Sequence, residues 1–180
     1  YPDITSSALV EKLSEFLGVP TENITAGCGS VALCQQLVQA VCAPGDEVVF
    51  GWRSFEAYPI IARIAPAVPV PVPNRADGSL DLEALADAVT DRTRLVFVCS
   101  PNNPTGPAIS RSDLSAFLDR IPSRVTVALD EAYYEYVRLD DPVDGVAEAI
   151  SRPNVVSLRT FSKAYGLAGL RCPKWWCRSP

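Results

Sequence analysis

A lysine in a hydroxyl-rich turn near the end of the chain is the residue best placed to do chemistry. Lys163 follows Thr160 and Ser162 closely, and Arg171 comes shortly after it. A lysine amine is a good nucleophile only when its surroundings disfavour the solvated ammonium form. Hydroxyl groups and an arginine that lie close together bind phosphate well. This stretch therefore predicts a nucleophilic lysine beside a phosphate site.

The chain contains no histidine, and this limits the mechanisms open to it. Nucleophile systems of the Ser-His and Cys-His kind are excluded, so Lys, Tyr, Asp and Glu remain for proton transfer. The cysteines form no CxxC pair, so we expect no zinc site or other metal site. Four of them stand in apolar settings and are predicted to be reduced and buried, which favours the cytoplasm. These four are Cys28, Cys34, Cys42 and Cys99.

Size and charge narrow the class of protein further. The chain has 180 residues, of which 48% are hydrophobic and 21% charged, as in globular proteins with a substantial core. A net charge of −5 argues against a nucleic-acid partner. The apolar runs are short, so we expect no membrane span and no secretory signal. Because the chain begins at Tyr1 without a methionine, we interpret it as a fragment or processed product.

Alternating strand and helix patterns predict an α/β fold, with a mostly parallel sheet flanked by helices. The predicted strands are 23–26, 47–50, 67–72, 93–99, 124–129 and 154–158. The predicted helices are 6–17, 31–42, 80–89, 111–120 and 146–150, and another begins within 52–58. Ser54 and Ser110 are the expected N-caps of two of these helices. Prolines at 66, 69, 71 and 73 make 67–72 an edge or irregular strand.

Loops with ligand-binding side chains follow four of these strands, at 27–30, 102–106, 130–133 and 160–163. In open α/β sheets, ligands bind beyond the carboxyl ends of the strands. The glycine-rich turn 27–30 leads into a helix N-terminus, which suits a phosphate, although a plain turn would look the same. Taken alone, Asp130 could equally be a cap, and Phe55 could stack on a planar ligand or belong to the core.

Several segments carry a resemblance to a known family. SPNNPTG, DEAYYEY and RTFSKAYGLAGLR resemble the fold-type I pyridoxal-phosphate (PLP) aminotransferases, and in particular the histidinol-phosphate aminotransferase group. GCGSVALCQQLVQ and VVFGWRSFEAYP are similar to its actinobacterial branch, which includes aromatic or phenylalanine aminotransferases. The likeness covers 1–171 and implies a partial PLP-binding large domain there. Residues 172–180 form a non-matching tail, so we expect no sheet strand after 171 and no small C-terminal domain.

The resemblance implies a role for each matching residue, with Lys163, Asp130 and Tyr133 as the catalytic ones. Lys163 would form the Schiff base with the cofactor and later carry a proton between substrate and cofactor. Asp130 would pair with the pyridine nitrogen, Asn103 and Tyr133 would bind the ring hydroxyl, and Phe55 would stack on the ring. Gly29, Ser30, Thr160, Ser162 and Arg171 would bind the phosphate, and Tyr1 would reach the phosphate of the neighbouring subunit of a homodimer.

The implied reaction moves an amino group from histidinol phosphate or an aromatic amino acid to 2-oxoglutarate, in histidine or aromatic amino-acid biosynthesis. Two alternatives remain open. One is a decarboxylase or lyase, which would use the same lysine and aspartate. The other is a truncated, inactive domain, since the arginine that clamps the substrate carboxylate lies outside the matching segments. Pro66 stands where members of the family usually have glycine.

Overall fold

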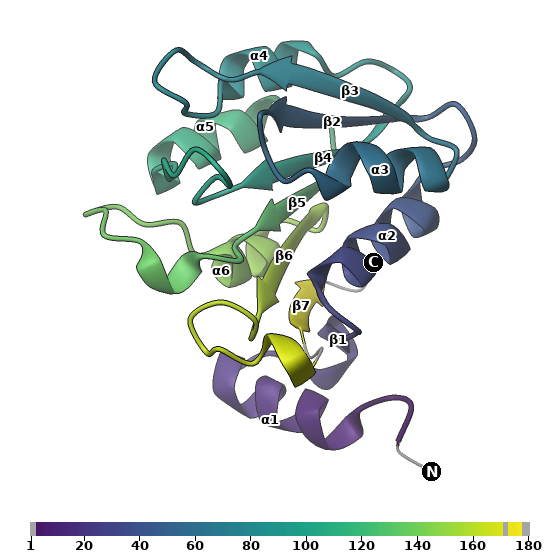
Figure 1. Ribbon diagram of the computed structural model, residues 1–180, viewed down its shortest axis with the longest axis vertical. Helices are drawn as coiled ribbons and strands as arrows, with labels where there is room; N and C mark the ends of the chain where they lie inside the picture. The colour runs from purple at the N-terminus through teal and green to yellow at the C-terminus, as the bar shows by residue number, and fades with distance from the viewer. Residues whose placement is uncertain (1–2, 171–172, 178–180) are drawn as a thin grey trace.

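A seven-stranded sheet organises the part of the chain that the computed structural model describes, residues 3–170 and 173–177. The strand order is β1-β7-β6-β5-β4-β2-β3 (Figure 1). The strands are β1 (Ile24–Ala26), β2 (Glu47–Trp52), β3 (Val68–Pro73), β4 (Thr93–Cys99), β5 (Thr126–Asp130), β6 (Val155–Thr160) and β7 (Pro173–Cys177). Neighbouring strands from β3 to β6 pair in parallel, whereas β7 is antiparallel to β6 and β1. The predicted mostly parallel sheet is confirmed.

Helices cover both faces of this sheet (Figure 1). They are α1 (Ser7–Leu17), α2 (Ser30–Val41), α3 (Ala57–Ile64), α4 (Leu82–Asp87), α5 (Arg111–Arg120) and α6 (Gly145–Ser151), with short 3₁₀ helices at Thr21–Asn23, Tyr134–Tyr136 and Ala168–Leu170. Apolar residues of α2 and α3 pack with one face of the central strands, and those of α1, α4, α5 and α6 pack with the other. Burial on both faces explains the unbroken apolar run of β4.

The two predicted helix caps had different outcomes. Ser110 caps α5, since its Oγ accepts a hydrogen bond from the N–H of Asp113 at 3.0 Å. Ser54 does not cap a helix, because α3 begins at Ala57, within the predicted range 52–58, and its N-cap is Glu56. The Ser54 hydroxyl instead donates a 2.7 Å hydrogen bond to Oδ1 of Asn102. The Asn102 amide is buried and comes from a loop that is distant in the sequence. It binds the hydroxyl that would otherwise be free to cap the helix.

Two further expectations need correction. Residues Pro173–Cys177 form β7, which pairs with β6 and β1, so the expectation of no strand after 171 is wrong. Of the four cysteines predicted to be buried, Cys34 and Cys99 are, but Cys42 is half-buried and Cys28 is exposed. Cys28 lies in the turn before α2, where its apolar neighbours do not cover it. β3 lies at one end of the sheet order, as its prolines predicted.

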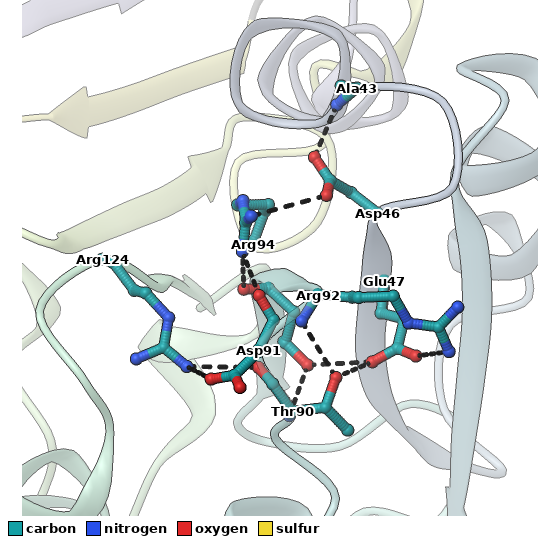
Figure 2. A network of polar contacts seen from close by, with 9 residues as sticks. Ala43, Asp46, Glu47, Thr90, Asp91, Arg92, Arg94 and Arg124 are labelled. Atoms are coloured by element: carbon teal, nitrogen blue, oxygen red, sulfur yellow. Dashed lines mark hydrogen bonds and ion pairs between the residues drawn. The ribbon is translucent and has the colours of Figure 1, made fainter.

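A network of hydrogen bonds and ion pairs links the amino ends of β2 and β4 (Figure 2). The carboxylate of Glu47, which is 4% exposed, accepts hydrogen bonds from Thr90 Oγ1 at 2.5 Å and Arg92 Nη2 at 2.6 Å. Beside it, Arg94 pairs with Asp46 at 3.7 Å. These contacts lie at the opposite end of the strands from the loops that carry the predicted site residues. Among residues 3–170 and 173–177, the helices lack the combination of length and apolar character that a membrane span requires.

Candidate active site

A cavity of about 220 Å³ lies where β4, β5 and β6 end. Cys99, Asp130 and Thr160, the last residues of these strands, all line it. Because the three strands are parallel neighbours, their carboxyl ends and the loops after them meet at one edge of the sheet. Eight predicted site residues line the cavity: Ser30, Phe55, Asn103, Asp130, Tyr133, Thr160, Ser162 and Lys163.

Gly29 shapes the cavity without lining it. It precedes the first residue of α2 and has φ 91°, a left-handed conformation that favours glycine. This turn directs the start of α2 at the cavity, so Ser30 and Val31 line it. The first N–H groups of a helix have no intrahelical partner and carry partial positive charge, which suits an anion. Two other predicted residues, Tyr1 and Arg171, lie outside the described residues.

Asp130 is the most unusual electrostatic feature of the site. Its side chain is buried, at 3% exposure, and it accepts hydrogen bonds from the Tyr58 hydroxyl at 2.6 Å and the Ala132 N–H at 3.3 Å. Burial raises the pKa of Asp130, and the Tyr58 hydrogen bond opposes that rise. Among the described residues, no lysine or arginine forms an ion pair with it. A buried carboxylate is costly unless a positive group approaches, so the cavity suits a ligand with a cationic nitrogen.

Lys163 stands at the exposed side of the same cavity, where its Nζ lies 5.3 Å from the centre of the Tyr133 ring. The turn before it is held by Thr160, whose buried Oγ accepts a hydrogen bond from the N–H of Ser162 at 3.0 Å. An amine, a phenol and two hydroxyls therefore face one small space. The cavity is smaller than the roughly 300–1,000 Å³ of a typical drug-sized ligand site, which suits a ligand with a single ring.

Two residues that support the site were missed by the sequence reasoning. Asn102 is buried, at 3% exposure, and its Nδ2 donates to the carbonyl of Arg53 at 2.9 Å. Together with the Ser54 bond, this holds the loop that bears Phe55 against the loop of Asn102. The doubled asparagine of the NNPTG segment was the only local signal for it. Tyr58 had none, because its partner Asp130 lies 72 residues away in the sequence.

The comparison with protein families identifies the family of this chain. Residues 1–173 match the family described as Aminotransferase class I and II. The chain belongs to this family. Aminotransferases of class I and II depend on pyridoxal phosphate, whose ring nitrogen and phosphate match the two charge preferences of the cavity.

Relatives within and around this family agree with the assignment. The aromatic amino acid aminotransferase of Rhodococcus jostii (strain RHA1) is 61% identical over 171 residues, which are 95% of this chain and 47% of that protein. The histidinol-phosphate aminotransferase of Sinorhizobium meliloti, solved in complex with pyridoxal-5'-phosphate, superposes with a TM-score of 0.91 at 33% identity, over 98% of this chain and 48% of that one.

The fold extends to enzymes of another reaction class. The L-threonine-O-3-phosphate decarboxylase of Porphyromonas gingivalis has a TM-score of 0.84 at 25% identity, over 99% of this chain and 51% of that one. The chain spans about half the length of the curated relatives it matches.

Proposed function

We propose that this chain forms the cofactor-binding part of a PLP-dependent aminotransferase that acts on aromatic amino acids and a 2-oxo acid such as 2-oxoglutarate. The observation that carries the proposal is the buried carboxylate of Asp130, which forms no ion pair within the described residues and faces the same cavity as Lys163. A protonated pyridine nitrogen would supply the positive charge that this carboxylate lacks. The amine of Lys163 would then be available for chemistry at the exposed side of the cavity.

The lining residues fit the other parts of PLP. Phe55 offers an aromatic face, and Asn103 and Tyr133 offer an amide and a phenol for the ring hydroxyl. Ser30, Thr160 and Ser162, with the start of α2, would bind the phosphate. Lys163 would hold the cofactor covalently through Nζ. The roles of Gly29, Arg171 and Tyr1, and the homodimer that Tyr1 implies, stay predictions, as does the extent of the large domain over 1–171.

When bound, PLP supplies an electron sink for negative charge at the reacting substrate carbon. The chain's own residues do the rest. Asp130 would keep the ring nitrogen positive, because a buried carboxylate stabilises a neighbouring cation strongly. Lys163 Nζ, once the amino group of the substrate has displaced it from the cofactor, would accept the proton from the substrate carbon and later give it back. This assignment suits a chain without histidine, since an amine is the base at hand.

The identity of the amino donor is the finer part of the proposal. The aromatic donor is supported by relatives at 61% identity, whereas the histidinol-phosphate enzyme is a structural neighbour at 33%. The decarboxylase at 25% identity is more distant still, so transamination is the favoured reaction class. A biosynthetic role and the cytoplasm remain predictions.

The proposal is tested by adding PLP to the chain and recording absorbance. We expect a new band from the bound cofactor that Lys163→Ala removes. Lys12→Ala is the matched control, because Lys12 is an exposed residue of α1 paired with Glu15, and it should keep the band. A band that survives in Lys163→Ala would refute the assignment of the lysine. A wild-type chain without any band would support the inactive alternative. Turnover of phenylalanine against histidinol phosphate then identifies the donor.

A further inference from the structure

A buried ion pair joins the ends of β5 and β6 behind the cavity. Arg159 Nε lies 3.3 Å from Glu131 Oε2, and Arg159 Nη2 lies 3.5 Å from Glu131 Oε1. The two residues are only 9% and 2% exposed. Ser157 Oγ donates to Glu131 Oε2 at 2.6 Å, and the N–H of Gly145 donates to Oε1 at 3.1 Å. The guanidinium of Arg159 also lies 3.7 Å from the Tyr134 ring centre.

This pair is adjacent in sequence to two cavity residues but lies on the other side of the sheet. Glu131 directly follows Asp130, and Arg159 directly precedes Thr160. Successive side chains of a strand point to opposite faces. Asp130 and Thr160 therefore face the cavity, while Glu131 and Arg159 face α6, whose first residue is Gly145. A Cβ on Gly145 would collide with the Glu131 carboxylate, so the packing there is tight.

The ion pair lies where the backbone hydrogen bonds between β5 and β6 end. The last residues of β5 and β6 to pair are Asp130 and Leu158. Beyond them, the N–H of Glu131 bonds the carbonyl of Leu158 at 2.8 Å, and the Glu131–Arg159 contact then continues the connection through side chains. This side-chain contact therefore adds to the backbone pairing of Asp130 with Leu158 and of Thr160 with Pro173.

We propose that the Glu131–Arg159 ion pair is a positioning device that fixes the spacing between Asp130 and Thr160 across the cavity, and thereby the affinity for PLP. The inference rests on the proposed function. Asp130 would meet the ring nitrogen and Thr160 the phosphate, so their spacing must match one rigid ligand. A buried pair adds little net stability over an apolar replacement of similar volume, but it demands one geometry.

The test replaces both charges, because removing Arg159 alone would leave the Glu131 carboxylate unpaired in the interior, and removing Glu131 alone would leave Arg159 with only its 3.5 Å contact to Asp144. In Glu131→Gln/Arg159→Met we expect a folded chain whose dissociation constant for PLP rises by about tenfold or more, since small displacements of binding groups are costly. The pH midpoint of the bound cofactor's absorbance should also shift, because the Asp130 carboxylate moves relative to the ring nitrogen. A purely structural role would lower the melting temperature and leave that midpoint unchanged.

Glu47→Gln/Arg92→Met is the matched control. It also removes a buried carboxylate and its arginine, but at the amino ends of the strands (Figure 2). Its PLP affinity should stay within about twofold of wild type, as for distant independent sites. Equal PLP affinity in the wild type and the Glu131/Arg159 variant would overturn the proposal, as would an equal loss in the control.

A third variant keeps the question answerable if the double variant does not fold. Arg159→Lys retains the charge but loses the two-nitrogen contact and the planar stack on Tyr134. At a temperature where it is folded, it should bind PLP more weakly than wild type with a shifted absorbance midpoint. Wild-type affinity and an unshifted midpoint in Arg159→Lys would overturn the proposal. A wild-type chain that binds no PLP would overturn the proposed function and this inference with it.

Discussion

The hydroxyl of Tyr58 donates a 2.6 Å hydrogen bond to Oδ2 of Asp130, and both side chains are buried. The Tyr58 ring is held by Phe97, stacked at 4.3 Å between ring centroids. Burial raises the pKa of Tyr58, so its proton stays in place to stabilise the carboxylate. The hydrogen bond thus holds the orientation of the group that faces the cavity and favours its charged form against the effect of burial.

Removing this hydroxyl should weaken the fold. In Tyr58→Phe, Asp130 loses a charge-assisted hydrogen bond, and we expect the free energy of unfolding at neutral pH to fall by about 1–3 kcal/mol. Denaturant unfolding of the cofactor-free chain measures this. Tyr136→Phe, at a residue that is 55% exposed, is the control and should have little effect. If the two variants were equally stable, the Tyr58 hydroxyl would not support Asp130.

Asp130→Asn should separate stability from cofactor binding. Because burial raises the folded pKa of Asp130 above its ordinary 3.8, its contribution to stability is fully present below pH 3.8 and is lost as pH rises through the raised pKa. A neutral amide avoids that loss. We therefore expect the cofactor-free variant to have a higher melting temperature than wild type at pH 7, by about 2–4 °C for each kcal/mol of destabilisation that the amide removes. We also expect the variant to lose affinity for PLP.

The pH dependence of that difference is the sharper measurement. The stability advantage of Asp130→Asn should disappear below pH 3.8, where the wild-type carboxyl is protonated in both states. Asp87→Asn is the control, because this exposed carboxylate, paired with Arg120 at 2.6 Å, is expected to matter little. A variant less stable than wild type at pH 7 would contradict the prediction.

Glu47 should show the opposite pH dependence. The Thr90 hydroxyl, and then Arg92, hold the pKa of Glu47 below its ordinary 4.5. Its stabilisation is therefore present above pH 4.5 and is lost as pH falls through the lowered pKa. We expect Glu47→Gln to cost about 1–3 kcal/mol at pH 7, and the cost to shrink in acid. Urea unfolding at several pH values measures this, with the exposed Glu11→Gln as a control that should be silent.

Pro66 occupies a position that suits glycine. It follows Ala65, the C-cap of α3, and has φ 22°, far from the value of about −65° that a proline ring prefers. Its side chain is exposed, so little packing is lost on substitution. Pro66→Gly should relieve strain of about 1–3 kcal/mol and lose about 1 kcal/mol through a freer unfolded chain. We expect a net gain in the urea midpoint.

Pro69→Gly provides the comparison. Pro69 is half-buried in β3, where the backbone conformation is not left-handed, so this change should lower the midpoint through the unfolded-state effect and some lost packing. A midpoint that falls equally in both variants would show that Pro66 is not strained.

The sequence by itself determined the elements and the loops that carry the chemistry. β4 and α5 were predicted with the bounds that the structure has, because apolar runs, helical periodicity and the Ser110 cap are local signals. The cavity residues could be predicted because parallel strands bring their carboxyl ends to one edge. The resemblance to a family named their roles.

Only the tertiary structure decided which side chains support that site. Tyr58 meets Asp130, Ser54 meets Asn102 and Glu131 meets Arg159 across 72, 48 and 28 residues. Local periodicity fixes which face of an element a residue occupies, but not which element packs against that face. Such partners follow from strand order and helix packing, which depend on interactions along the whole chain, so the support of Asp130 was visible only once the sheet was assembled.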